Sequence, residues 1–126
     1  MATVKDCIYK RVRGDGYDSV VASTTIYRAY AINMLGGNAS ASSDFLGFAL
    51  QDDVNGATIE IQTKGIAIGY IDTSQTIVKG DKLKVDGGVL QKASATEMYV
   101  CKAEEAVTTT ASDDAYIPVL IERGVA

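Results

Sequence analysis

The side chains that most often perform catalysis or bind metals are scarce in this sequence. It contains no histidine, which excludes every catalytic triad, dyad or metal site that needs an imidazole. The most suggestive acids stand in adjacent pairs: Asp52–Asp53, Glu104–Glu105 and Asp113–Asp114. Neighbouring side chains on a strand point to opposite faces, and acids in turns are usually solvated, so these pairs do not predict a catalytic dyad. The turn at Asp52–Gly56 also lacks the carboxylate spacing of a calcium loop.

The two cysteines, Cys7 and Cys101, are too few for a disulfide framework or a four-ligand zinc site. No imidazole is available to activate either thiol, and the apolar segment around Cys101 predicts a small buried side chain there. Free thiols are the default expectation, although the sequence leaves one bridge between the two cysteines open. The sequence contains no glycine-rich phosphate-binding loop. The glycine-containing segment Lys79–Lys82 is typical of a β-turn instead. We therefore predict no enzymatic activity, no cofactor and no metal.

Composition and charge restrict the class of partner. The chain has 126 residues, 47% of them hydrophobic and 22% charged, which is typical of one folded domain rather than a disordered chain. Its net charge of −4 argues against nucleic acid and against anionic membranes as main partners. No run reaches the roughly 18 apolar residues of a membrane span, and the first residues lack the pattern of a secretory signal. We expect a protein made in the cytoplasm.

The first 18 residues differ from the rest of the chain. They hold four bases and three acids, a balance of +1, whereas the other 108 residues hold eight bases and 13 acids, a balance of −5. We predict an N-terminal arm or edge segment over residues 1–18 and a compact β-domain over residues 19–126. Tyrosine and arginine are enriched in protein–protein interfaces, although ordinary surface tyrosines remain an alternative. The candidate interface residues of the arm are Tyr9, Lys10, Arg11, Arg13 and Tyr17.

From Ser23 onward the sequence is typical of β-structure. β-Branched and aromatic residues form short runs, and each run is followed by glycine, asparagine or aspartate. The predicted strands are Ser23–Met34 (with Ile26, Tyr30, Ile32 and Met34 on one face), Phe45–Leu50, Thr58–Thr63, Gly65–Ile71, Gly80–Val85, Val89–Gln91, Met98–Lys102 and Tyr116–Ile121. Asp86–Gly88 predicts a hairpin turn. A single helical turn is expected within Asp72–Lys79. Pro118 lacks an amide hydrogen, which favours an edge position for the last strand.

The segment Gly65–Ile71 is apolar on both of its faces. Such a strand is expected either in the centre of the fold or with one face against a partner subunit. Ile66, Ile68 and Tyr70 share one face and are therefore further candidates for an interface.

Two runs carry a resemblance to a known family. They are Phe45–Ile66, which reads FLGFALQDDVNGATIEIQTKGI, and Ile77–Gly88, which reads IVKGDKLKVDGG. With the closing stretches Tyr99–Glu105 and Ile117–Ile121, they resemble the phage capsid decoration, or cement, proteins over residues 23–124. The resemblance implies a compact β-barrel or β-tulip fold without catalytic residues or cofactor. It also implies a homotrimer on the outer surface of a phage head, at local threefold sites where it binds and stabilises the major capsid protein lattice of the virion.

Two other functions remain open on the sequence. A small ligand- or carbohydrate-binding β-module would need exposed aromatic residues at a concave site, and the lack of tryptophan weighs against it. A minimal enzyme would have to work with carboxylates alone, and the sequence offers no pair at a suitable spacing.

Overall fold

The computed structural model describes residues 16–126, and within them the fold is all-β, as predicted. Residues 1–15, which include most of the predicted arm, lie outside the described part. Eleven strands and one short 3-10 helix make up the fold. They are β1 (Tyr17–Val21), β2 (Ala31–Ile32), η1 (Ser42–Asp44), β3 (Gly47–Ala49), β4 (Thr58–Gln62), β5 (Gly65–Ile71), β6 (Thr76–Ile77), β7 (Lys82–Asp86), β8 (Val89–Lys92), β9 (Met98–Ala103), β10 (Val107–Thr108) and β11 (Ala115–Val125).

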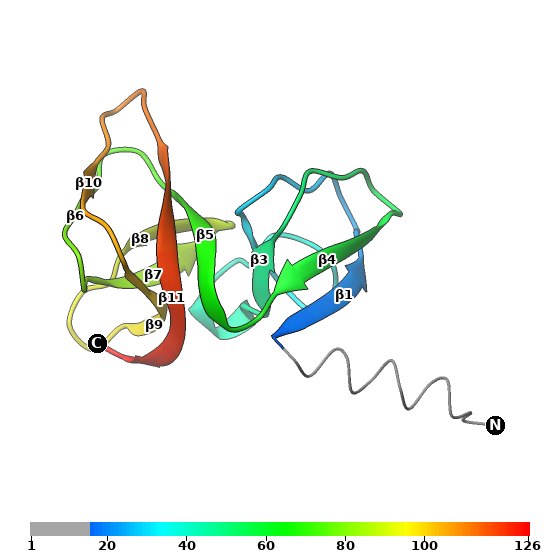
Figure 1. Cartoon of the computed structure of the whole chain (residues 1–126), viewed down its shortest axis with the longest axis horizontal. Helices are drawn as coiled ribbons and strands as arrows, with labels where there is room; N and C mark the ends of the chain where they lie inside the picture. The colour runs from blue at the N-terminus through cyan, green and yellow to red at the C-terminus, as the bar shows by residue number, and fades with distance from the viewer. Residues whose placement is uncertain (1–15) are drawn as a thin grey trace.

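The strands form two bodies that lie side by side in Figure 1. One is a closed five-stranded barrel with the order β11-β5-β8-β7-β9, to which the pair β10-β6 is attached by sequence; this body, residues 64–126, is called the barrel below. The other is a four-stranded sheet with the order β1-β4-β3-β2; this body, residues 16–63, is called the small lobe. Tyr17 and Asp18, which the sequence analysis includes in the arm, begin the edge strand β1 and pair with Gln62 and Ile61 of β4.

A tight hairpin and one parallel contact close the barrel. The β7–β8 hairpin turns at Gly87 and Gly88, both with positive φ, which confirms the turn predicted at Asp86–Gly88. Strand β5 then meets β8 in parallel through Ile71 and Leu90. This single pair completes the ring of five strands.

Each body has its own apolar core, and the two cores meet at the junction. Strand β4 alternates, with Ile59 and Ile61 fully buried in the small lobe. Leu83 and Val85 of β7 point into the barrel. Phe45 and Phe48 come from the small-lobe sequence but pack into the barrel core, with their ring centroids 5.0 Å apart. This aromatic pair joins the two bodies through a shared hydrophobic contact.

The predicted strand Ser23–Met34 is wrong for most of its length. Within this segment, only Ala31–Ile32 forms a strand, β2. Tyr30 donates its amide hydrogen to the carbonyl of Tyr27 in a turn, and Ala29 has a positive φ of 70°. Ile26 and Ile32 are buried as expected, but Met34 is largely exposed on a loop. The alternation of apolar residues is therefore produced by turns that return to one core, which sequence periodicity does not distinguish from a strand.

The helical turn predicted within Asp72–Lys79 is also wrong. Thr73 and Ser74 form a turn in which Ser74 has a positive φ of 60°, and hydrogen bonds to a distant segment hold the residues on either side of it. The Thr109 hydroxyl accepts from the Gln75 amide at 2.8 Å and donates to the Asp72 carbonyl at 2.7 Å. Strand β6 then pairs with β10. Pairing with a segment far along the chain thus outweighs the local preference of this stretch for a capped helical turn.

Pro118 does not lie on an edge strand, so that prediction is wrong as well. Strand β11 pairs with β5 on one side and with β9 on the other. Pairing with β9 begins only at Val119, and the Pro118 carbonyl accepts from the Glu104 amide just beyond the end of β9. The N–H and C=O groups of one residue in an antiparallel strand point to the same side. The position of the absent Pro118 amide hydrogen therefore faces β9, at the point where the pairing of β11 with β9 ends.

We predict that Gly69→Ala destabilises the barrel by about 1–3 kcal/mol, the usual cost of overpacking. A Cβ at Gly69 would lie 2.6 Å from Leu90 Cδ1 and 3.3 Å from a Val119 methyl, and both side chains are fully buried. Urea unfolding of Gly69→Ala, Leu90→Val and the double variant measures this as a cycle. Because valine lacks the δ-methyl that is struck, the double variant should lose less than the sum of the singles. Additive losses would contradict this packing.

Candidate interaction surface

An apolar surface covers the outside of the barrel where β5 and β11 pair. The register places Tyr70 opposite Tyr116, Ile68 opposite Pro118 and Ile66 opposite Leu120. These six residues share the outward face of the two strands and are called the outer ladder. The intervening residues of both strands, including Ala67, Gly69, Ile71, Ile117 and Val119, point inward and are buried.

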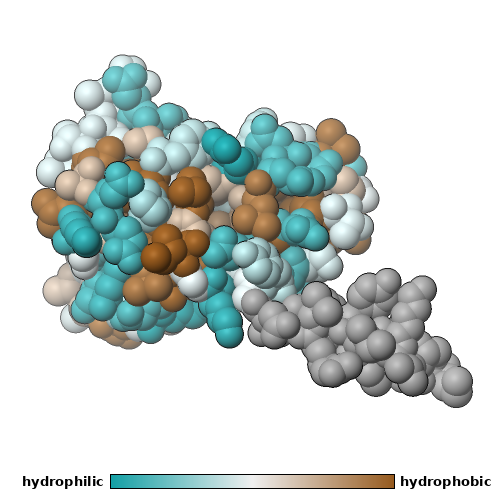
Figure 2. Space-filling view, in the orientation of Figure 1, coloured by the Kyte–Doolittle hydropathy of each residue, from teal (hydrophilic) through white to brown (hydrophobic). Residues whose placement is uncertain are grey.

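The outer ladder is unusual for a barrel surface in water. Outward positions of a solvated strand are normally polar, yet here each is aromatic, aliphatic or proline. Ile66 and Ile68 keep 59% and 47% of their surface exposed. Figure 2 shows hydrophobic residues gathered on this face, over β11 and β5. Contiguous exposed apolar patches mark interaction sites, so the outer ladder is the strongest candidate surface in the described chain.

A pocket of about 240 Å³ borders the outer ladder at the junction with the small lobe. Ile66 and Ile68 form one wall, and Arg28 and Leu50 contribute from the small lobe, with Phe48 below. The pocket therefore continues the apolar surface inward from β5. An aliphatic side chain of a partner could enter it, which would bury apolar area on both sides.

Tyr27 and Tyr30 extend the surface beyond the end of the outer ladder and form a row of four rings with its Tyr70 and Tyr116. Ring centroids are 5.5 Å apart for Tyr27 and Tyr30, 4.8 Å for Tyr30 and Tyr70, and 5.1 Å for Tyr70 and Tyr116. The Arg28 guanidinium lies 5.3 Å from the centre of the Tyr116 ring. We call these four tyrosines with Arg28 the tyrosine cluster. Tyrosine and arginine are the residue types that most often dominate binding energy in interfaces.

The tyrosine cluster is held by the backbone of both bodies. The turn that contains Ala29 presents Tyr27, Arg28 and Tyr30, and the Ala29 carbonyl accepts from the Tyr70 amide at 3.1 Å. Burial, followed by the nearby Tyr116 and Asp114, raises the pKa of Tyr30, so its phenol stays neutral at physiological pH. Packing and backbone hydrogen bonds thus fix the rings before any partner arrives.

The structure brings three of the predicted interface residues together and leaves others apart. Ile66, Ile68 and Tyr70 lie in the outer ladder, while Tyr17 is exposed on β1 of the small lobe. The four other arm candidates, Tyr9, Lys10, Arg11 and Arg13, lie outside the described residues. Sequence reasoning missed the other half of the outer ladder: Tyr116, Pro118 and Leu120. Their spacing of two was visible in the sequence, but only the β5–β11 register shows which face they share.

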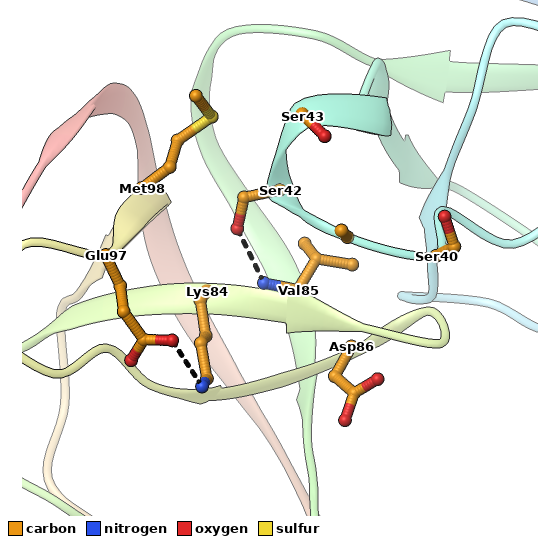
Figure 3. A pocket seen from close by; sticks show the side chains of 9 residues that line it. Ser40, Ser42, Ser43, Lys84, Val85, Asp86, Glu97 and Met98 are labelled. Carbon is orange, nitrogen blue, oxygen red and sulfur yellow. Dashed lines mark hydrogen bonds and ion pairs between the residues drawn. The ribbon is translucent and has the colours of Figure 1, made fainter.

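A second pocket, of about 460 Å³, lies between η1 and the β7–β8 hairpin (Figure 3). Three of its polar side chains are held by each other or by the backbone. Lys84 Nζ lies 2.8 Å from Glu97 Oε2, and the Ser42 hydroxyl accepts from the Val85 amide at 3.0 Å. The Lys84 amine points away from the Ser42 hydroxyl in Figure 3, so the two do not form a nucleophile–base pair.

Other functional features are few in the described chain. Cys101 is a free thiol in the barrel core, and burial raises its pKa well above the ordinary value, which makes it a poor nucleophile. Within residues 16–126, no group of three or more acidic, histidine or cysteine residues could hold a metal ion. No helix of this part of the chain is both long and apolar enough to cross a membrane. Neither pocket described above has a tyrosine in its lining.

Comparison with known protein families and with curated proteins finds no match for this sequence.

We predict that the Glu97 carboxylate stabilises the fold only above acidic pH. Hydrogen bonds from Lys84 and then from the Ser94 amide hold the pKa of Glu97 below its ordinary value. A lowered folded-state pKa gives stability that is present above the ordinary value of about 4.3 and lost as pH falls through the folded value. Glu97→Gln should therefore lower the Tm at pH 7 and match the unmodified protein near pH 2.

Thermal unfolding followed by circular dichroism between pH 7 and pH 2 measures this difference. Glu60→Gln, at an exposed glutamate of β4, serves as the matched control and should leave the Tm unchanged. A Glu97→Gln deficit that stays constant down to pH 2 would show that the carboxylate acts through shape and not through its charge.

Proposed function

We propose that this protein is a structural adhesion protein that decorates the outer surface of a phage head and stabilises the major capsid protein lattice as a homotrimer. The observation that carries the proposal is the outer ladder, an apolar face on the outside of a closed barrel. The sequence resemblance to capsid decoration proteins supports the same function. Neither pocket described above offers chemistry that would favour an enzyme over a binding protein.

Burial of the outer ladder accounts for self-association in this proposal. Removing apolar surface from water contributes about 25 cal/mol per Å², and fully burying an isoleucine contributes about 1.5–3 kcal/mol relative to leaving it exposed. A threefold ring needs heterologous contacts, in which one face of each subunit meets a different face of the next. The outer ladder supplies one such face, and the pocket beside it supplies a recess for a neighbouring side chain.

Mass action accounts for stabilisation of the lattice. A protein that binds only the assembled lattice stabilises it by about 2.7 kcal/mol per site when its free concentration is a hundred times Kd. A trimer that touches several capsid subunits gains avidity on the order of 10²–10⁴-fold without stronger individual contacts. The role needs surfaces that are held in place, and the described chain supplies them without any reactive group.

We predict that Ile68→Glu dissociates the trimer. The side chain sits in the middle of the outer ladder, and an uncompensated carboxylate in a buried interface is strongly unfavourable. Size-exclusion chromatography with light scattering should give a trimer mass for the unmodified protein and a monomer mass for the variant. Val78→Glu, at a similarly exposed residue beside β6, is the matched control and should remain a trimer. A trimer of Ile68→Glu would place the interface elsewhere.

We predict that residues 2–15 contribute to capsid binding and not to the trimer. The segment carries four bases and the arm candidates Tyr9, Lys10, Arg11 and Arg13, and its removal leaves β1 complete. Cosedimentation with decoration-free heads of the encoding phage should show saturable binding of the full chain and reduced occupancy of the deletion variant. Light scattering should give the same mass for both. Equal occupancy would exclude a role of the arm in binding.

A further inference from the structure

The outer end of the small lobe carries the most exposed large apolar side chains of the described chain. Leu35 is 82% and Met34 is 76% exposed, and Val21 and Val54 are also largely exposed. These four residues come from three segments and are called the apolar tip. They are separate from the outer ladder, which lies on the barrel.

Backbone hydrogen bonds hold the three segments of the apolar tip side by side. The Ser23 amide donates to the Gly36 carbonyl at 3.0 Å, which fixes the Met34–Leu35 loop to the end of β1. The Gly56 amide donates to the Ala22 carbonyl at 2.8 Å, which fixes the Val54 turn to the other side of the same end. The backbone segments that carry the four exposed apolar side chains are therefore held next to one another.

The Met34–Leu35 loop is built to keep its shape. The side-chain oxygen of Asn33 accepts from the amides of Leu35 and Gly37, both at 3.0 Å, and its side-chain nitrogen donates to Asp44 at 3.1 Å. Gly36 has a φ of +84°, and a Cβ there would collide with the Val21 carbonyl. A surface that is ordered before binding loses less entropy when it docks, which favours recognition by such a loop.

Charge on the small lobe indicates what the apolar tip can meet. Residues 16–63 hold five acids and one base, a net charge of −4, whereas residues 64–126 hold nine acids and seven bases, a net charge of −2. The one base, Arg28, lies over Tyr116 of the barrel. An acidic lobe that carries an apolar tip repels a second copy of itself and an anionic lipid surface, and attracts a protein surface with basic residues.

We propose that the apolar tip docks into an apolar recess that is bordered by lysine or arginine residues on the capsid protein lattice. This inference rests on the proposed function and adds to it the contact surface and the chemistry of the partner. The outer ladder joins copies of the chain, and the apolar tip of each copy attaches it to the lattice. Electrostatic attraction brings the small lobe to the basic border, and burial of Met34 and Leu35 slows dissociation.

The double variant Met34→Ser/Leu35→Ser tests the inference on decoration-free heads of the encoding phage. We expect at least a tenfold higher apparent Kd in cosedimentation, because the largest apolar contacts of the tip are removed. The trimer mass and the Tm should match those of the unmodified protein, since both side chains face solvent within the subunit. Val78→Ser, which removes an exposed apolar side chain from the barrel, is the matched control and should bind as the full chain does.

Ionic strength and charge reversal test the electrostatic part. Association of the unmodified protein with heads should slow as sodium chloride rises from about 50 to 500 mM, because exposed charges are screened over shorter distances. Glu60→Lys, on the exposed face of β4, should slow association at low salt and have little effect at high salt. A rate that is independent of both salt and Glu60→Lys would overturn the basic border.

The outcomes separate this inference from the proposed function. If the unmodified protein does not bind heads, both are wrong. If it binds and the double variant binds equally well, the apolar tip is not the contact, while the decoration function stands. A changed oligomer mass of the double variant would make the tip a contact between copies and would also overturn the inference. Should the double variant lose Tm, Leu35→Gln alone provides the comparison, with the same expected weakening of binding.

Discussion

The antiparallel register between β5 and β11 is the constraint on which the rest of the structure depends. Closure of the barrel fills every inward position of these strands, with Gly69 leaving space for Leu90 and Val119. Because side chains alternate along a strand, this packing fixes the outward set as well. A slip of one residue would bury the outer ladder and expose the core set. The apolar outer face is thus as strongly specified as the core itself.

Both apolar and polar contacts join the two bodies at their junction. Phe45 and Phe48 enter the barrel core from the small-lobe sequence, and Tyr30 of the small lobe contacts Tyr70 of the barrel. The Tyr70 amide also donates to the Ala29 carbonyl. In the proposed function, these contacts link the attachment of each subunit to its neighbours in the trimer, which is the condition for avidity.

The sequence predicts those parts of the fold that are decided by local pattern. Strand β4 alternates cleanly because one face is buried, and the glycines of the β7–β8 hairpin meet a turn that requires positive φ. That Ile66, Ile68 and Tyr70 share one face follows from the alternation of side chains along β5. The predictions at Pro118 and Asp72 are wrong because their conformations are set by partners far along the chain, Glu104 and Thr109. The apolar tip is missed for the same reason: its segments meet only through long-range hydrogen bonds.

An adhesion protein that binds both itself and a partner needs two surfaces that do not bind each other's targets. The different chemistries of the outer ladder and the apolar tip would meet this need. The outer ladder has no charged residue among its six members. Its burial between copies of the chain therefore leaves none of its own side chains as an unpaired buried charge. The apolar tip belongs to a lobe with a net charge of −4, which makes a tip-to-tip contact between copies unfavourable. In the proposed function, burial of apolar area drives self-association, while attachment also requires a basic complement. That difference would let trimers form in solution and select one kind of surface afterwards.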